Sequence, residues 1–385
     1  MNLALLTSVA GNGGSASTAF QTTRLLARAG HQAALFAPGA YWAERGRREN
    51  VPVHSFLELR RGLHALSFWR DFRGFRRYLA EQAVDAVLVQ KSPEQWLAHF
   101  AIRSLRRPIA LVRLRGVVFP IRPSLFNRRL HNRMELIVCS ASVIAQQYAQ
   151  LPGFETAHVK VLLEGVDTLG FTPATLEQKA AARARWKLHP EALLIGTAGR
   201  PASVKGHDLL LRAFAKAWEA CEPLRKRNGG ARLCIFSDES RRGPGSYASL
   251  QDLSRELGLQ DRVDLRPGFV TEMREVYHAL DVYVLPSRGS EGSSRAGLEA
   301  CAAGLPLLAS AVGVLPDLVL DRVTGQLVPP DDAATLAQAL IQLAVHWPAA
   351  KEWGVAARRR MQEHFREETY AEKLAQLLAE AVAGK

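Results

Sequence analysis

The sequence predicts an α/β protein made of two doubly wound domains, each with a parallel sheet covered by helices on both faces. Short apolar strands alternate with helical segments along the chain, which is the pattern of parallel sheets. The chain has 385 residues, which is long for one hydrophobic core and favours two domains. A segment punctuated by glycine and proline, residues 161–174, separates two series of strands and helices.

The first series begins with the apolar stretch Asn2–Ser8, followed by the loop Ala10–Ser17 and a helix from about Thr18 to Ala29. Gly30 ends this helix, because glycine readily adopts the left-handed conformation found after helix C-termini. The further strands expected in this series are Gln32–Ala37, Ala86–Gln90, Ile109–Arg113 and Leu136–Ser140. The N-terminal domain is therefore expected to comprise residues 1–170.

The second series forms a domain over residues 171–348. Its expected strands are Leu193–Ala198, Ala231–Ser237, Val263–Leu265, Val282–Leu285 and Pro306–Ala309. Its expected helices are Gly206–Ala220, Leu250–Leu257, Met273–Ala279 and Ser294–Ala303. A helical segment over residues 349–385 ends the chain.

Composition limits the classes of function. Hydrophobic residues make up 48% of the chain, which is enough to fill two cores. The cysteines lie far apart without a CxxC pair, which argues against a zinc site or a disulfide framework and fits a reducing cytoplasm. No stretch reaches about 18 consecutive apolar residues, so no transmembrane helix is expected. We therefore expect a cytoplasmic protein with no bound metal, attached to a membrane at most peripherally.

Positive charge is concentrated in the first half of the chain. Residues 1–170 contain 22 Lys and Arg against 11 Asp and Glu, whereas residues 171–385 contain 28 against 26. A basic surface attracts anions, such as an anionic membrane, a phosphorylated glycolipid or nucleic acid. No recognised nucleic-acid-binding module accompanies this charge, so nucleic acid is not expected as a partner.

The segment richest in chemistry is LPSRGSEGSSRAGLEACAAGLPLLAS, residues 285–310. A strand stops at Pro286, a loop of small residues follows, and a helix begins near Ser294. Ligands of open parallel sheets bind where strands end, and free N–H groups at a helix start suit a diphosphate. Glu291 and Glu299 flank this helix start. Carboxylates beside an anion site are expected to bind hydroxyl groups, which a sugar and a ribose supply.

A second segment, AGRPASVKGHDLLLRAF, covers residues 198–214. Its strand ends at Gly199, and Arg200 and Lys205 lie in the loop before the next helix. Arginine forms forked hydrogen bonds with phosphate oxygens and lysine supplies a point charge. The loop is therefore a candidate diphosphate clamp.

Together these segments resemble the donor domain of glycosyltransferase family 4. The pattern GR…KG, followed by PS…EGxxxxxLEAxAxGxPxxAS, carries the resemblance, and its two glutamates match Glu291 and Glu299. LLEGVDTLGFTP, residues 162–173, is similar to the family's interdomain segment. The similarity covers residues 160–340 well and the N-terminal domain in outline. It implies the GT-B fold, in which two Rossmann-like domains, acceptor domain first, face a central cleft, and the final helical segment packs back towards the first domain.

The resemblance implies a retaining glycosyltransferase that uses a nucleotide-sugar, linked to UDP, GDP or ADP, as co-substrate, with no other cofactor and no metal. Arg200 and Lys205 would neutralise the diphosphate, Glu291 would bond the donor sugar, and Glu299 would bond the ribose. The acceptor would be a glycan or glycolipid of the bacterial envelope, such as lipopolysaccharide core, and the basic first half favours a phosphorylated one. The residues expected to contact the nucleotide-sugar are Gly13, Gly14, Gly199, Phe269, Val270, Gly292, Ser293, Ser294 and Glu299.

The chain departs from the family pattern in three places. Glu164 stands where asparagine is usual, and Arg295 stands where an apolar residue is usual. LVRLRGVVFP, residues 111–120, is similar to a strand that commonly ends in a functional histidine, but Gly116 occupies that position. Arg113 and Arg115 precede it, and we expect Arg115 to face the cleft and act with Arg200, Lys205 and Glu291. Both arginines could instead be structural, and which residue replaces the histidine is left open.

An amphipathic helix is expected within residues 59–79, where arginines alternate with aromatic residues. Apolar residues recur there at helical spacing: Leu66, Trp69, Phe72, Phe75 and Leu79. The simpler interpretation packs this apolar face on the N-terminal domain with the arginines in solvent. The alternative is a surface that docks on anionic lipid or on a phosphorylated acceptor.

Two alternative functions fit the same motifs. A GT-B epimerase would release UDP without an acceptor, and a catalytically degenerate partner subunit would bind its ligand without turnover.

His207 follows Lys205 and Gly206 directly, and it is expected to be a surface residue at a helix start.

Overall fold

A computed structural model divides the chain into two compact units, and each is described by itself. The first unit comprises Met1–Leu163 and Glu367–Lys385, and the second comprises Glu164–Arg366. The first division thus falls after Leu163 rather than near residue 170, and only the part of the final helical segment from Glu367 onwards belongs to the first unit. The structure describes residues 1–11, 13–60, 64–200, 202–226, 228–237, 246–268, 270, 272–289 and 291–385.

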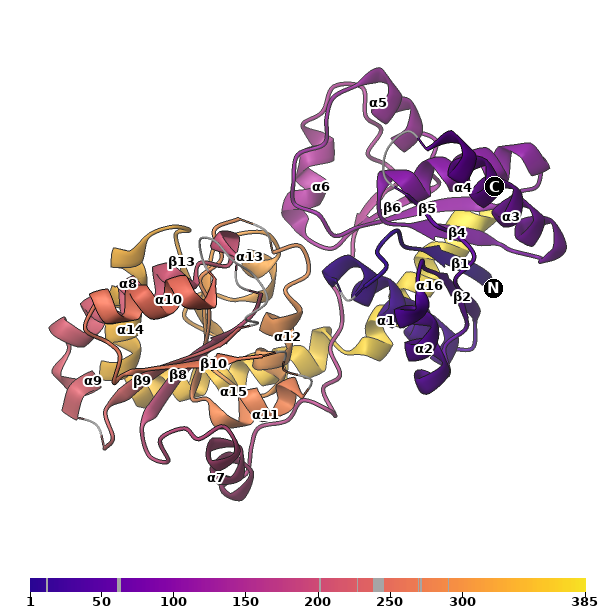
Figure 1. Cartoon of the computed structure of the whole chain (residues 1–385). Coiled ribbons are helices and arrows are strands. Elements are labelled where there is room, and N and C mark those ends of the chain that lie inside the picture. Colours follow the sequence, from indigo (N-terminus) through magenta and orange to yellow (C-terminus); the bar gives the residue numbers. More distant parts are fainter. Residues whose placement is uncertain are drawn as a thin grey trace. The chain divides into compact units, whose positions relative to one another are not determined.

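The first unit is built on a seven-stranded parallel sheet in the order β3-β2-β1-β4-β5-β6-β7 (Figure 1). The strand order reverses between β1 and β4, which creates a switch point where ligands of such sheets bind. In chain order its elements are β1 (Asn2–Leu6), α1 (Gly14–Arg28), β2 (Gln32–Phe36), α2 (Ala40–Glu49), β3 (Val53–His54), α3 (Ala65–Glu81), β4 (Ala86–Val89), α4 (Ser92–Leu105), β5 (Ala110–Arg115), α5 (Leu125–His131), β6 (Leu136–Cys139), α6 (Ser142–Ala149), β7 (Val159–Val161) and α16 (Glu367–Ala383).

Both faces of this sheet are covered by helices. The C-terminal helix α16 packs against α1, β5 and β6, and Figure 1 shows it in yellow beside the strands. Its buried residues Tyr370, Leu374 and Leu378 recur every four residues, so they form one face of the helix and join the core. On the opposite face of the sheet, Phe75 of α3 lies 5.3 Å from Phe36 of β2, ring centre to ring centre.

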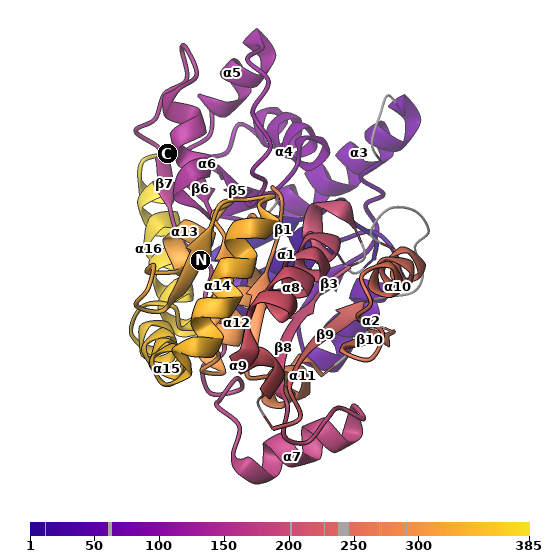
Figure 2. The same ribbon diagram turned by 90° about the vertical axis from the view of Figure 1, so that its left-hand side faces the viewer.

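The second unit is built on a six-stranded parallel sheet in the order β10-β9-β8-β11-β12-β13. Helices α8 and α14 lie side by side on one face of it, as both views show (Figures 1 and 2). Its elements are α7 (Leu176–Arg185), β8 (Leu193–Ala198), the 3₁₀ turn Ser203–Lys205, α8 (His207–Ala220), α9 (Glu222–Lys226), β9 (Ala231–Ser237), α10 (Tyr247–Glu256), β10 (Val263–Pro267), α11 (Met273–Ala279), β11 (Val282–Leu285), α12 (Arg295–Ala302), β12 (Leu307–Ser310), α13 (Leu315–Leu318), β13 (Gly325–Val328), α14 (Ala333–Val345) and α15 (Trp347–His364).

All the expected strands occur, with ends displaced by two residues or fewer, but other elements differ from the expectation. Helix α1 begins at Gly14, four residues before the expected start at Thr18. Strands β3, β7 and β13 were not expected, and β5 extends to Arg115. The final helical segment is two helices, because the chain pairs with another segment at the break, where the Val166 N–H donates to the Phe365 carbonyl at 2.7 Å. None of the helices in the described ranges is long and apolar enough to cross a bilayer.

Candidate functional site

The two loops that carry the sequence motifs meet at the carboxyl edge of the second unit's sheet. Strands β8 and β11 are hydrogen-bonded neighbours, so the loops that leave their C-terminal ends start side by side. The first loop runs from Gly199 to Gly206 and the second from Pro286 to Ser294. This edge is where open parallel sheets bind their ligands.

Glu291 and Lys205 form an ion pair at the centre of this edge. The Lys205 Nζ donates to the Glu291 Oε1 at 2.5 Å, and the Ser287 hydroxyl donates to the same oxygen at 2.6 Å. The Glu291 side chain is buried, whereas the Lys205 side chain is 25% exposed. The lysine therefore lies next to a carboxylate and remains accessible to a ligand.

Two glycines allow the backbone segments around Glu291 to approach closely. A Cβ atom on Gly206 would lie 1.9 Å from the Pro286 carbonyl oxygen, and one on Gly313 would lie 1.9 Å from the Glu291 carbonyl oxygen. Both glycines have positive φ, 68° and 59°, which other residues rarely adopt. Only glycine fits these positions, and this close packing fixes the Glu291 loop on both sides.

Arg288 ties the first loop to the second. Its guanidinium donates to both carboxylate oxygens of Asp208, at 2.8 and 2.9 Å, and to the Ser203 carbonyl at 2.7 Å. Its backbone N–H donates to the Val204 carbonyl at 2.8 Å. Hydrogen bonding to Asp208 raises the pKa of Arg288 above its ordinary value, so the charge on this clamp is permanent.

Glu299 lies on α12, buried beside Tyr277. The Tyr277 hydroxyl donates to the Glu299 Oε2 at 2.9 Å, and the Arg295 Nε lies 3.1 Å from the Glu299 Oε1. Burial, and then the neighbouring Glu299 charge, raise the pKa of Tyr277, so the tyrosine remains a hydrogen-bond donor. Arg295, the departure from the family pattern, is thus paired with the second glutamate of the motif.

The start of α12 is strained and polar. Ser294, its N-cap residue, is buried with φ of 43°, a conformation that costs energy in a residue other than glycine. Its hydroxyl has no hydrogen-bond partner among the described residues. Gly292 and Ser293 are half-buried beside it. This terminus presents backbone N–H groups of the kind that bind phosphate or hydroxyl groups.

Three more of the expected residues, Gly199, Arg200 and Val270, follow strands β8 and β10 of the same sheet. Arg200 is exposed and makes no ion pair within the described ranges, and Gly199 donates its N–H to the Phe236 carbonyl. Val270 is half-buried. Phe269 lies outside the described residues.

His207 corrects an expectation from the sequence. It is the first residue of α8 but is buried, with its ring nitrogen Nε2 beside Gly199. Burial, and then the charge of Lys205, lower its pKa to about 4. The ring is therefore neutral at pH 7 and supports the strand end instead of facing solvent.

The residues expected in the N-terminal domain lie in the first unit, at the carboxyl edge of its own sheet. Gly13 is the N-cap residue of α1, and Gly14 is the first residue of that helix, so the glycine loop leads directly into a helix terminus. Arg113 and Arg115 lie on β5, and both are buried.

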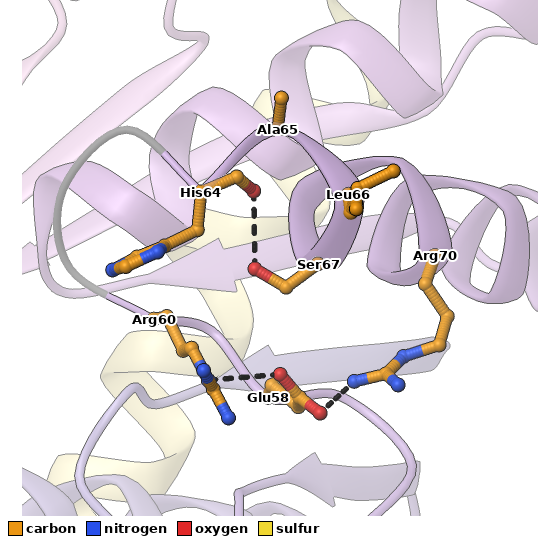
Figure 3. Close-up of a pocket in the computed structure, with 7 residues that line it drawn as sticks. All are labelled: Glu58, Arg60, His64, Ala65, Leu66, Ser67 and Arg70. Atoms are coloured by element: carbon orange, nitrogen blue, oxygen red, sulfur yellow. Dashed lines mark hydrogen bonds and ion pairs between the residues drawn. The ribbon is translucent and has the colours of Figure 1, made fainter.

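Two hollows of the first unit flank the start of α3. Figure 3 shows the first, of about 420 Å³, in which the Glu58 carboxylate forms ion pairs with Arg60 and Arg70. The second, of about 500 Å³, is largely apolar, and its walls include Phe68, Trp69, Trp96 and Phe100.

The expected amphipathic helix is α3, but its apolar residues do not form one buried face. Phe75 and Leu79 are buried against the sheet, as expected. Leu66 and Trp69 are exposed, because only the C-terminal half of α3 lies over the sheet. Arg73, Arg76 and Arg77 are exposed, as expected.

In the ranges that the structure describes, no group of three or more His, Cys, Asp or Glu side chains is arranged to hold a metal ion. The second unit instead groups cations and carboxylates at one sheet edge. Lys205 and Arg200 suit the oxygens of a diphosphate, and Glu291 and Glu299 suit hydroxyl groups. This set of side chains fits a ligand that carries both a diphosphate and hydroxyl groups.

Two families match the chain. Residues 12–168 match the family described as Glycosyltransferase Family 4, and residues 191–346 match the family described as Glycosyl transferases group 1. Among curated proteins, the D-inositol 3-phosphate glycosyltransferase of Mycobacteroides abscessus is 35% identical over 202 residues, which are 52% of this chain. The match spans 42% of that relative, so it covers less than half of the relative's length.

Solved structures share the fold over almost the whole chain. A glycosyltransferase from Rickettsia africae has a TM-score of 0.87 at 17% identity, with 100% of this chain and 99% of that chain covered. Anabaena HepE, solved with UDP and glucose, has a TM-score of 0.81 at 19% identity, with 98% and 99% covered. The apo form of the lipopolysaccharide outer core galactosyltransferase WaaB has a TM-score of 0.72 at 16% identity, with 98% and 99% covered. These similarities establish the two-domain GT-B fold.

Proposed function

Because the chain belongs to the family 4, or group 1, glycosyltransferases, we propose that it transfers a sugar from a nucleotide-sugar to an acceptor glycan or glycolipid. The observation that carries this proposal is the set of side chains at the edge of the second sheet. Buried Glu291 and Glu299 stand there with Lys205, beside the polar start of α12. A nucleotide-sugar has hydroxyl groups for the carboxylates and a diphosphate for the cations.

On the donor side, Lys205 and Arg200 neutralise the diphosphate. Their positive charge stabilises the negative charge that develops on the leaving group, which is the largest contribution that such sites make to rate. Lys205 changes partner from Glu291 to phosphate when the donor binds, and the freed Glu291 then bonds the hydroxyls of the sugar. Glu299 bonds the ribose, and Val270 lies near the base.

We expect the reaction to retain the anomeric configuration, with the acceptor hydroxyl attacking the face from which the diphosphate leaves. No side chain forms a covalent intermediate in this scheme, and Lys205 and Arg200 take the place of a metal ion. Product analysis by proton NMR, which reads the anomeric coupling, tests the stereochemistry. An inverted product would contradict it.

For the acceptor, we propose a glycan of the bacterial envelope such as lipopolysaccharide core, acted on at the cytoplasmic face of the membrane. The similarity to WaaB in fold and the basic first half of the chain support this choice. The exposed Leu66 and Trp69 of α3, next to exposed arginines, are suited to contact an anionic bilayer. Replacing Arg73, Arg76 and Arg77 together by glutamine should weaken co-sedimentation with vesicles of anionic lipid, and unchanged binding would contradict the contact.

The donor site is tested first by thermal shift against UDP, GDP, ADP, CMP and dTDP. One nucleotide should stabilise the wild-type protein, and Arg200→Ala and Glu299→Gln should weaken that shift. Arg255→Ala is the matched control, because Arg255 is an exposed arginine of α10 that forms a surface ion pair with exposed Asp252. The absence of any shift at millimolar nucleotide would overturn the transferase proposal.

The same preparation separates the alternatives. UDP release from the donor without an added acceptor would favour an epimerase. Binding of a nucleotide without any sugar transfer from the nucleotide-sugars tested would favour a catalytically degenerate partner subunit.

A further inference from the structure

Two arginines lie together at the ligand-binding edge of the first unit. Arg113 and Arg115 alternate along β5, so their side chains project from the same face of the strand. Arg115 is the last residue of the strand, and exposed Gly116 follows it. Only 6% of Arg113 and 7% of Arg115 is exposed. Two guanidinium groups are therefore buried side by side near the strand end.

Neither guanidinium is paired with an acid in the described part of the chain. Arg113 donates to the Gln95 side-chain oxygen and, at 2.9 Å, to the His131 Nε2. Arg115 donates to the Phe119 carbonyl at 2.7 Å. Burial, and then the charges of the two arginines, lower the pKa of His131 to about 3, so this acceptor is neutral at pH 7.

One buried acid, Glu94, lies near enough for its charge to act on Arg113, but it already accepts hydrogen bonds from the backbone. Glu94 is buried and accepts hydrogen bonds from the backbone N–H groups of Ser8, Gln90 and Lys91, at 2.6 to 2.7 Å. It therefore joins two loops, the one after β1 and the one after β4, and within the described ranges it forms no ion pair with the arginines.

Hydrogen-bonding capacity is also left over around the arginines. The Nε atoms of Arg113 and Arg115 and the Tyr148 hydroxyl have no partner among the described residues. The Arg115 guanidinium lies 5.8 Å from the centre of the Tyr148 ring. Arginine does not lose its proton in proteins, and a buried charge that is not paired with a counter-charge is energetically unfavourable. An anion bound at this edge would supply the missing charge.

We propose that Arg115, supported by Arg113, binds a phosphate group carried by the acceptor. The inference rests on the proposed function and specifies its acceptor as a phosphorylated glycan, polyol or glycolipid. Phosphate matches the forked geometry of a guanidinium, and it replaces the Phe119 carbonyl as the acceptor from Arg115. Arg113 adds a second positive charge from behind, and His131 and Gln95 keep it in place. Arg115 is thus a residue for acceptor specificity, on a different unit from the donor carboxylates.

The test is a thermal-shift titration with phosphate-bearing probes. Inorganic phosphate and glucose 6-phosphate should stabilise the wild-type protein, and glucose should not. Arg115→Gln should raise the concentration of either phosphate compound needed for half-maximal stabilisation by about tenfold or more, which is the usual effect of losing a charged hydrogen bond. Arg122→Gln is the matched control, because Arg122 is an exposed arginine seven residues further along the chain, and it should respond like wild type.

Arg115→Lys keeps the charge but loses the fork, so it should give an intermediate response and covers the case in which Arg115→Gln fails to fold. Glucuronate tests the alternative anion. A response to glucuronate equal to that to glucose 6-phosphate would overturn the assignment of phosphate.

The outcome also separates this inference from the proposed function. Glu299→Gln should lose the nucleotide response and keep the phosphate response, and Arg115→Gln should show the reverse. Equal phosphate responses in wild type and Arg115→Gln, or no wild-type response at millimolar phosphate, would overturn the phosphate site and leave the donor site intact. If the wild-type protein responds to phosphate but to none of the nucleotides, the donor site is overturned instead.

Discussion

At the scale of single residues, two histidines show how burial sets charge. His131 in the first unit and His207 in the second are both buried, and the pKa of each is lowered, to about 3 and about 4. Burial is the larger cause for both, and neighbouring cations add to it. Each ring is neutral in the folded protein and becomes protonated readily only when the chain unfolds.

Acid should therefore destabilise the protein before most carboxylates titrate. Above pH 6.5 both histidines are neutral in the folded and unfolded states, so their contribution to stability is complete. As the pH falls from 6.5 towards 4, the unfolded chain binds protons that the folded chain refuses, and each histidine lowers the free energy of unfolding by up to about 1.4 kcal/mol per pH unit. Urea midpoints of wild type and His131→Gln at pH 7 and pH 5 test this. A variant that loses as much stability as wild type over this interval would contradict it.

Gly206 and Gly258 form a matched pair for measuring close packing. Both have positive φ, 68° and 66°, so alanine pays a similar backbone cost of about 1 kcal/mol at each. Nothing lies within 4 Å of a Cβ on Gly258, whereas one on Gly206 would collide with the Pro286 carbonyl. We expect Gly206→Ala to destabilise the second unit by about 2 to 4 kcal/mol and Gly258→Ala by about 1 kcal/mol. Equal thermal midpoints for the two variants would show that the loops can separate without cost.

At the scale of elements, the proposed donor site depends on two loops that hydrogen bonds hold together. Arg288 bonds Asp208, Ser203 and Val204, so it positions the short turn that carries Lys205 against the loop that carries Glu291. Arg288 acts through Lys205 and does not itself reach the ion pair. It is a positioning residue.

Replacing Arg288 should loosen Lys205 without removing its charge. We expect Arg288→Gln to reduce kcat/KM about 10- to 100-fold, because misplaced charges lose transition-state stabilisation. Asp331→Asn removes only an exposed partner of Arg288 and serves as the control. If the loss comes from positioning, Arg288→Lys should recover part of the activity. Unchanged kcat/KM in Arg288→Gln would contradict the clamp.

The elements also show what sequence patterns can and cannot predict. Strands β8, β9 and β11 have the expected bounds, because apolar runs between polar segments mark buried strands well. Edge strand β7 was missed because its three residues are largely exposed and have no apolar run. Helix α1 begins in a glycine and serine segment that propensity alone assigns to a loop.

The candidate site, too, was predictable only in part. The spacing of Glu291 and Glu299 is a local pattern, so the sequence alone predicts their roles. Arg288 and Asp208 lie 80 residues apart and meet only because β8 and β11 are neighbours. The sequence also shows Arg113 and Arg115, but it does not show that they are buried and form no ion pair with the acids that the structure describes. Such contacts depend on strand order, which a residue pattern does not contain.

At the scale of the whole molecule, the first unit is discontinuous in sequence. Helix α16 places Tyr370, Leu374 and Leu378 in the same core as strands from the first 163 residues. The second unit lies entirely between those two parts of the chain.

A core substitution in α16 should therefore weaken the first unit and spare the second. We expect Leu374→Ala to destabilise the first unit by about 2 to 5 kcal/mol, because Leu374 is fully buried. Glu372→Ala, at an exposed position of the same helix, should change stability by less than about 0.5 kcal/mol. Hydrogen exchange measured by mass spectrometry should show that residues 1–163 lose protection and that residues 164–366 keep theirs. A uniform loss across both units would contradict their independence.

The place of α16 in the chain also determines the order in which the protein can fold as it leaves the ribosome. Residues 1–163 emerge before the second unit, but a helix of their core is translated after the second unit is complete. The nascent first unit therefore cannot complete its core until α16 is made, and part of one sheet face stays uncovered while the second unit folds as a continuous segment. A message truncated before codon 367 would yield a protein with a complete second unit and an incomplete first unit, the form that chaperones and proteases recognise by its exposed apolar surface.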